Sequence, residues 1–251
     1  MGKTSAIRSR RSAARLILAG DVGGTKTLVG LFRVSARGLK PWRWATYASG
    51  AHKSLEDIAG RFLAANGSPR IAAACFGVAG PVIDGAARLT NLPWTPSEHG
   101  LAASLGLAKI RLLNDVQAAA FGMLHLKKPA FAVIKRGRAA AFGAGHWPAA
   151  NLAVISPGTG LGEALLYWDG TRHHPIASEG GHGGFAPRGK LQIELLEWLD
   201  HTRGAHVSCE RVLSGPGLIA IYEFLRLSAR GREPEPLARA RATGDRAAII
   251  S

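Results

Sequence analysis

The sequence predicts an α/β fold, because strand-like segments, some apolar throughout and some with the two-residue period of strands, are interspersed with segments of helical spacing. In the first half, strand-like runs lie at 16–19, 27–32, 42–47, 71–78 and 110–113. Helical patterns follow or separate them at 54–65, 100–106 and 116–124. The 251 residues, 47% of them hydrophobic, are enough for one large or two modest domains with ordinary cores.

The first two strands are expected to form a β-hairpin. An apolar run at 16–19 leads into the glycine-containing segment 21–26, and the alternating segment 27–32 follows. Further along, Ser54 stands where a helix N-cap is expected, directly before apolar residues at helical spacing. The short strand 110–113 leads almost directly into an alanine-rich helix.

The second half continues this alternation of strands and helices. Strands are predicted at 130–134, 152–155 and 164–168, with a glycine loop between the last two. Leucines at helical spacing predict helices over 191–199 and 217–227. The chain then becomes rich in Arg, Ala and Pro from Arg230 onwards.

Charge and cysteine content restrict the function. A net charge of +15 suits an anionic partner, either a nucleic acid or a nucleotide. Because no helix-turn-helix, RNP or zinc-finger pattern accompanies the charge, nucleic-acid binding is not expected to be the main function. Cys75 and Cys209 lack metal-ligand spacing, which argues against a zinc site or a disulfide framework and fits a cytoplasmic protein. No apolar window is long enough for a membrane segment.

The segment Asp21-Val22-Gly23-Gly24-Thr25-Lys26 can hold phosphate. Two glycines at a hairpin tip permit positive φ, so backbone N–H groups can converge on phosphate oxygens. Thr25 and Lys26 add a hydroxyl and a cation, and Asp21 can hold a hydrated Mg²⁺. The alternative is an ordinary Gly-Gly hairpin. The spacing excludes both a P-loop and a dinucleotide-binding fingerprint.

Further motifs follow this segment in the order found in bacterial glucokinases, which the chain resembles from about Leu16 to Leu227. They are Phe76-Gly77-Val78-Ala79-Gly80-Pro81-Val82, Leu89-Thr90-Asn91-Leu92-Pro93-Trp94, Leu112-Leu113-Asn114-Asp115, Gly158-Thr159-Gly160-Leu161-Gly162, Ser178-Glu179-Gly180-Gly181-His182 and His206 to Gly217. The resemblance implies an actin-like ATPase (ribonuclease H-like) fold with two domains around a cleft. We expect a basic tail over 1–15, a small domain over 16–115 and a larger, incomplete domain over 116–251.

The resemblance also implies roles for the residues of these motifs. Asp115 is expected to be the catalytic base and Asn114 a sugar ligand, whereas the residues alone also allow Asp115 to be a helix N-cap. The expected ATP ligands fall in two motifs. The first motif supplies Asp21, Gly23, Gly24, Thr25 and Lys26. The second supplies Gly158, Thr159 and Gly160, which are expected to meet the transferred phosphoryl group. The expected sugar ligands are Asn91, Asn114, Asp115, Glu179, His182 and Glu210. The substrates implied are glucose and ATP with Mg²⁺, and the family commonly forms homodimers.

Three departures from the family pattern bear on this prediction. Gly183-Gly184 follows His182, where glucokinases usually carry an acidic residue two positions after the histidine. Lys26 replaces an asparagine found in many relatives. The chain ends soon after the segment Leu213 to Gly217, so we expect the adenine pocket to be incomplete.

The predicted activity is ATP-dependent phosphorylation of glucose at its 6-hydroxyl. One alternative is a truncated protein that binds glucose without turnover, because the sugar-side residues are all present. A kinase for another hexose and a sugar-responsive regulator also remain open. The repressor and kinase family that shares the Glu-Gly-Gly-His motif binds zinc through a cysteine cluster, and this chain has only two isolated cysteines.

Overall fold

The computed structural model describes residues 15–36, 38–89, 91–135, 147–204 and 206–228, together with Arg230 and Glu235. The predicted basic tail lies outside these residues apart from Arg15, as does nearly all of the chain beyond Arg230. The chain forms two compact units, one up to Ala118 and one from Ala119 onwards.

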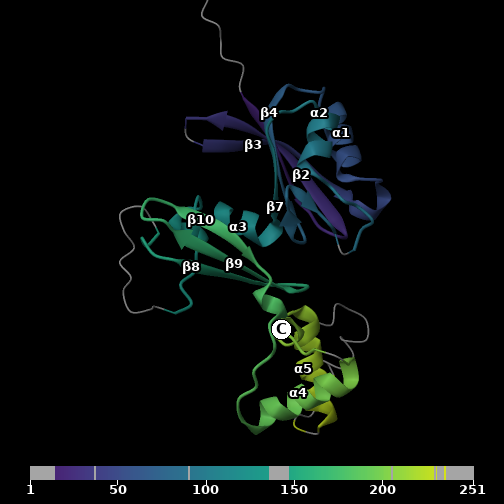
Figure 1. The fold of residues 1–251 in the computed structure, drawn as a ribbon, viewed down its shortest axis with the longest axis vertical. Coiled ribbons are helices and arrows are strands. Elements are labelled where there is room, and N and C mark those ends of the chain that lie inside the picture. Colours follow the sequence, from purple (N-terminus) through teal and green to yellow (C-terminus); the bar gives the residue numbers. More distant parts are fainter. Residues whose placement is uncertain are drawn as a thin grey trace, which may run out of the picture. The chain divides into compact units, whose positions relative to one another are not determined.

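The first unit is built on a mixed five-stranded sheet (Figure 1). In spatial order the strands are β3 (Gly38–Ala48), β2 (Lys26–Ser35), β1 (Leu16–Val22), β4 (Ile71–Val78) and β7 (Ile110–Asn114). Strands β3, β2 and β1 are antiparallel neighbours, whereas β1, β4 and β7 run parallel. The predicted hairpin and the three other strands predicted in this half are therefore confirmed.

The helices of the first unit begin where capping side chains stand. They are α1 (Leu55–Ala65), α2 (Glu98–Leu105) and α3 (Asp115–Met123). The Ser54 hydroxyl accepts a hydrogen bond from the Asp57 N–H at 3.3 Å, as the sequence predicts. The short hairpin of β5 (Val82–Ile83) and β6 (Ala86–Ala87) is not predicted, because its strands of two residues have no readable period.

The core of this unit joins the sheet to α1. Leu18 and Phe76 on the sheet and Ile58 and Phe62 on α1 are almost fully buried in one cluster. The helix residues recur at the spacing of one helical face, which is why α1 can bury them together against the strands.

The second unit contains an antiparallel sheet in the order β10-β9-β8. Its strands are β8 (Leu152–Pro157), β9 (Leu161–Trp168) and β10 (His173–Ser178). The helices are α4 (Gly189–Arg203) and α5 (Gly215–Leu227), with short 3₁₀ turns η3 (Gly180–His182) and η4 (Cys209–Arg211). Leu195 and Leu199 of α4 pack with Ala220 and Phe224 of α5 in a separate core.

The strand predicted at 130–134 is wrong. A 3₁₀ turn, η2 (Lys128–Ala130), occupies its start, and none of the described strands pairs with the residues after it. Val133 is 71% exposed and Ile134 fully exposed. An apolar run becomes a strand only where a neighbouring strand takes up its backbone hydrogen bonds, and none does so here.

None of the helices in the described part of the chain combines the length and the apolar content that a bilayer crossing requires.

Truncating the core of α1 tests this packing. Phe62→Ala is expected to lower the free energy of unfolding by about 3–5 kcal/mol, because it leaves a cavity at a side chain that is 1% exposed. Phe121→Ala is the matched control, since Phe121 is 45% exposed and its loss should cost about 1 kcal/mol or less. Urea unfolding measures both, and equal losses would show that α1 does not hold this core.

Candidate active site

The hairpin tip between β1 and β2, called the glycine hairpin below, is stabilised by the buried hydroxyl groups of Ser49 and Thr27. The Ser49 hydroxyl donates to the Gly23 carbonyl at 2.8 Å and lies 2.9 Å from the Thr27 hydroxyl. The Ser49 N–H donates to the Thr25 carbonyl at 3.0 Å, and the Gly23 N–H donates to the Lys26 carbonyl at 3.0 Å. The tip is therefore a rigid backbone loop.

Close approach, and not positive φ, explains the second glycine of this hairpin. Neither Gly23 nor Gly24 has a positive φ, so that part of the sequence argument is wrong. A Cβ on Gly24 would lie 2.8 Å from the Cβ of Asn91, closer than real Cβ atoms approach other heavy atoms. The missing side chain thus lets Asn91 lie directly against the hairpin, and two predicted site residues meet.

Asn114, and not Asp115, caps helix α3. The Asn114 Oδ1 accepts hydrogen bonds from the N–H groups of Val116 and Gln117 at 3.0 and 3.1 Å. Its amide nitrogen donates to the Gly80 carbonyl at 3.2 Å, and the residue is 8% exposed. The N-cap interpretation of Asp115 is therefore wrong, because the neighbouring asparagine fills that role.

Asp115 keeps one carboxylate oxygen unbonded among the described residues. Its Oδ1 accepts the Val116 N–H at 2.8 Å, and no hydrogen bond reaches Oδ2 within that part of the chain. A Cβ on Gly77 of β4 would lie 3.5 Å from the Asp115 Cα and 3.2 Å from the Ala118 Cβ. The first turn of α3 thus begins directly beside the end of β4.

Asp115 lies close enough to Asp21 to affect the ionisation of the Asp21 carboxyl group. Partial desolvation of its carboxyl group raises the pKa of Asp21, the negative charge of Asp115 raises it further, and Lys26 opposes both effects. Both carboxylates follow the parallel part of the sheet, Asp21 at the end of β1 and Asp115 after β7. This edge is where a parallel sheet presents polar groups to ligands.

The second unit brings its predicted sugar ligands together around a turn. The Glu210 Oε2 accepts the Leu161 N–H at 2.9 Å, and a Cβ on Gly160 would lie 2.5 Å from that oxygen. His182 Nδ1 lies 3.9 Å from Glu210 Oε1, and His182 Nε2 lies 3.7 Å from Glu179 Oε2. Two carboxylates and one imidazole thus form a single acceptor-rich cluster.

The turn 158–160, called the glycine turn below, is tied to the start of α5. The Gly158 carbonyl accepts the Gly215 N–H at 2.8 Å, and Ser214 caps the helix by accepting from the Gly217 N–H at 3.1 Å. The amino end of a helix carries partial positive charge and favours anions. Thr159 is exposed at the tip of the turn.

Sequence reasoning missed Ser49 and Glu163. Ser49 reaches the glycine hairpin only because β3 pairs with β2, which aligns Ala48 with Lys26. A Cβ on Gly180 would lie 2.2 Å from the Glu163 Oε2, so Glu163 lies beside the Glu179 motif. Neither residue carries a local sequence signal, since strand pairing and turn packing bring them there.

The Gly183-Gly184 departure has a local structural account. The Gly183 carbonyl accepts the Cys209 N–H at 2.8 Å, and Gly184 forms an isolated bridge with Ser208. A Cβ on Gly184 would lie 3.5 Å from the His206 ring, which is ordinary contact. The backbone therefore has room for the acidic residue of other family members, and the segment is held without it.

Comparison with known proteins decides the family. The glucokinase family model matches residues 18–251, which is most of the chain. The chain belongs to the glucokinase family. A glucokinase from Nostoc punctiforme is 37% identical over 213 residues, which cover 84% of this chain and 60% of that protein. The chain thus spans about 60% of the length of this relative.

Solved structures agree with this assignment. A glucokinase from an Antarctic psychrotroph superposes with a TM-score of 0.73 at 28% identity, over 95% of this chain and 74% of that one. A ROK family glucokinase from Streptomyces griseus, solved in complex with glucose and AMPPNP, gives 0.56 at 25% identity, over 94% of this chain and 68% of the other. The predicted actin-like ATPase fold is confirmed.

The raised pKa of Asp21 gives a test of the carboxylate pair. Because the pKa of Asp21 is raised on folding, its protonated form favours the folded state. This contribution to stability is complete below pH 3.8, the ordinary pKa of Asp, and is lost as pH rises through the folded-state pKa. Asp21→Asn removes the charge, so the variant should become more stable than the wild type as pH increases. Urea unfolding at about pH 3.5 and about pH 7 measures the difference.

Asp200→Asn is the control for this experiment, because Asp200 is an exposed residue of α4. Its stability should follow the wild type at both pH values. If Asp21→Asn shows the same pH profile as the wild type, Asp21 does not carry the electrostatic cost assigned to it.

Proposed function

We propose that this glucokinase-family chain transfers the γ-phosphoryl group of ATP to the 6-hydroxyl of glucose, with Asp115 as the catalytic base. The observation that carries the proposal is the division of roles at the start of α3. Asn114 takes over the capping of the helix, which leaves one oxygen of Asp115 available to accept a proton. A general base must have such an unoccupied acceptor.

The 6-hydroxyl oxygen attacks the γ-phosphorus, its proton passes to Asp115, and the bond between the γ-phosphorus and the bridging oxygen breaks to release ADP. In the second unit, the proposed phosphoryl ligands are the backbone amides of the glycine turn and Thr159. The amino end of α5 beside that turn adds partial positive charge, which supports this role.

On the donor side, the proposed nucleotide ligands are Gly23, Gly24, Thr25 and Lys26. The rigid tip, closed by Ser49, favours this role because preorganised amides need no reordering when phosphate binds. Asp21 fits a hydrated Mg²⁺, which prefers carboxylate, water and phosphate oxygens. When bound, the ion would neutralise charge on the nucleotide phosphates.

The sugar is proposed to bind Glu179, His182 and Glu210 from the second unit and Asn91, Asn114 and Asp115 from the first. The cluster of two carboxylates around one imidazole supplies the acceptors that pyranose hydroxyls require. Asn114 has already committed its oxygen and one amide hydrogen. Its contribution to sugar binding is therefore limited to the second amide hydrogen.

The decisive variant is Asp115→Asn. The amide retains the size of the side chain but cannot take the proton, so kcat should fall by about 10²–10⁴-fold. The dissociation constant of glucose should stay within about tenfold. Coupled glucose-6-phosphate formation with Mg²⁺ and ATP gives kcat, and calorimetric titration gives glucose affinity.

Asp84→Asn is the matched control for this experiment. Asp84 lies in the exposed turn between β5 and β6 with φ of 49°, a conformation that asparagine also tolerates. Its kcat should equal that of the wild type. Normal turnover by a folded Asp115→Asn variant would refute the base assignment. Glucose binding by the wild type without any turnover would establish the alternative, a glucose-binding protein.

A second variant tests the sugar cluster. Glu210→Gln should raise the KM for glucose by about tenfold or more, because a neutral amide accepts sugar hydroxyl hydrogen bonds more weakly than a carboxylate. Glu197→Gln on the exposed surface of α4 is the control and should leave KM unchanged. If both variants have the wild-type KM, Glu210 supports the glycine turn through the Leu161 N–H without contacting sugar.

A further inference from the structure

Three basic residues immediately precede three adjacent parallel strands of the first unit. Arg15 comes before β1, Arg70 before β4 and Lys109 before β7. Since these strands are parallel neighbours, the cations gather at the amino ends of the sheet. The candidate active-site carboxylates lie at the other ends. β1 has seven residues, so the two sets are about 20 Å apart.

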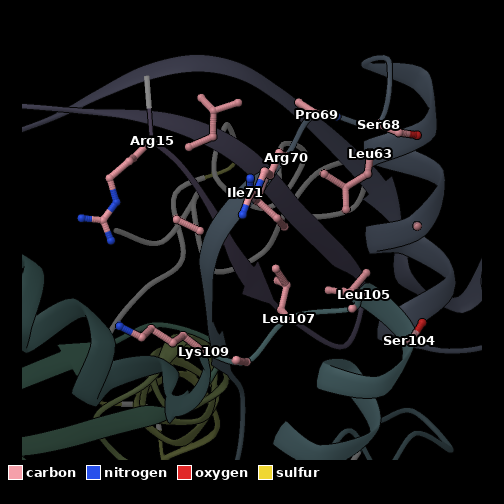
Figure 2. Close-up of a pocket in the computed structure, with 15 residues that line it drawn as sticks. Arg15, Leu63, Ser68, Pro69, Arg70, Ile71, Ser104, Leu105, Leu107 and Lys109 are labelled. Atoms are coloured by element: carbon pink, nitrogen blue, oxygen red, sulfur yellow. The ribbon is translucent and has the colours of Figure 1, made fainter. Parts of the chain in front are cut away.

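A hollow of about 820 Å³, called the amino-end hollow below, opens between these strand ends and the carboxyl ends of α1 and α2. This volume is in the range of small-molecule sites. In Figure 2, Arg15 and Lys109 lie on one side of the hollow, whereas Leu63 and Leu105 lie on the other. The hollow is therefore basic at one side and apolar at the other.

Within the described part of the chain, the cations of the hollow have no anionic partner. Among the described residues, no ion pair or hydrogen bond involves the side chains of Arg15, Arg70 or Lys109. None of the described residues that line the hollow is Asp or Glu. Three clustered positive charges repel one another, so the site favours an anion that reaches all of them.

Stabilisation of the helix ends does not account for these cations. The carbonyls near the end of α1 are taken by other groups: Leu63 accepts from the Ser68 N–H at 2.8 Å, and Phe62 accepts from the Asn66 amide at 2.8 Å. At the end of α2, Ala102 accepts from the Leu107 N–H at 3.1 Å. Among the residues that the structure describes, no hydrogen bond joins the side chains of the three cations to these carbonyls.

We propose that the amino-end hollow binds an anionic amphiphile, a molecule with a phosphate or carboxylate at one end and an apolar body at the other. The anionic group pairs with Arg15, Arg70 and Lys109, and the apolar body covers Leu63, Leu105 and Leu107. A sugar does not fit, because the lining side chains that can accept hydrogen bonds are two serines, Ser68 and Ser104. The basic head 1–14 carries the same sign of charge as the hollow, which disfavours it as the occupant.

Octyl phosphate is the probe, because it combines both chemical features in one small molecule. Calorimetric titration into the purified full chain, below the micelle concentration, is expected to show one bound molecule per chain. 1-Octanol and inorganic phosphate are titrated separately, and each should bind at least about tenfold more weakly. Added salt should weaken the binding of octyl phosphate.

Two kinds of variant locate the binding. Arg15→Ser with Lys109→Ser should weaken octyl phosphate at least about tenfold, whereas Lys40→Ser with Lys53→Ser, an equal loss of exposed charge in the same unit, should change it by less than about twofold. Ser104→Phe adds bulk to the lining without altering charge, and it should also weaken binding. Circular dichroism and thermal unfolding confirm that each variant is folded.

The proposal is overturned by any of several results. Absence of saturable binding, or equal loss of affinity in the two double variants, would show that the hollow is not the site. Equal affinity for 1-octanol would make the cations irrelevant. Equal affinity for inorganic phosphate, with no effect of Ser104→Phe, would reduce the site to a simple anion site.

Discussion

The parallel alignment of β1, β4 and β7 is the constraint on which the first unit depends. Because parallel strands all end at the same edge, Asp21 and Asp115 become neighbours although they lie 94 positions apart in the sequence. The same alignment gathers the three cations at the opposite edge. One sheet thus places these two carboxylates and these three cations about a strand length apart.

Two glycines and one asparagine complete the candidate active site at this edge of the sheet. Gly24 lets Asn91 approach the hairpin, and Gly77 lets the first turn of α3 lie against β4. Asn114 then accepts from both Val116 and Gln117 at the amino end of α3, so this helix end uses only one oxygen of the Asp115 carboxylate. The carboxylate proposed as the base therefore keeps one oxygen unbonded among the described residues, as a general base requires.

In the second unit, one carboxylate both supports a backbone turn and belongs to the acceptor-rich cluster. Glu210 supports the backbone of the glycine turn through the Leu161 N–H and also lies near His182. One side chain thus connects the proposed phosphoryl site with the proposed sugar site. The motifs that contain Gly160, His182 and Glu210 are separated in the chain, and the packing of η3 and η4 beside β9 brings them together.

The sequence by itself determined the alternation of strands and helices, the α/β class, the hairpin at the start of the chain and the motifs of the glucokinase family. These follow from local periodicity, capping residues and residue order, which need no knowledge of distant contacts. Tertiary structure alone decided that Ser49 closes the hairpin, that Asn114 caps α3 and that 130–134 forms no strand. Each of these outcomes depends on which distant backbone groups become hydrogen-bond partners, and local sequence does not encode that choice.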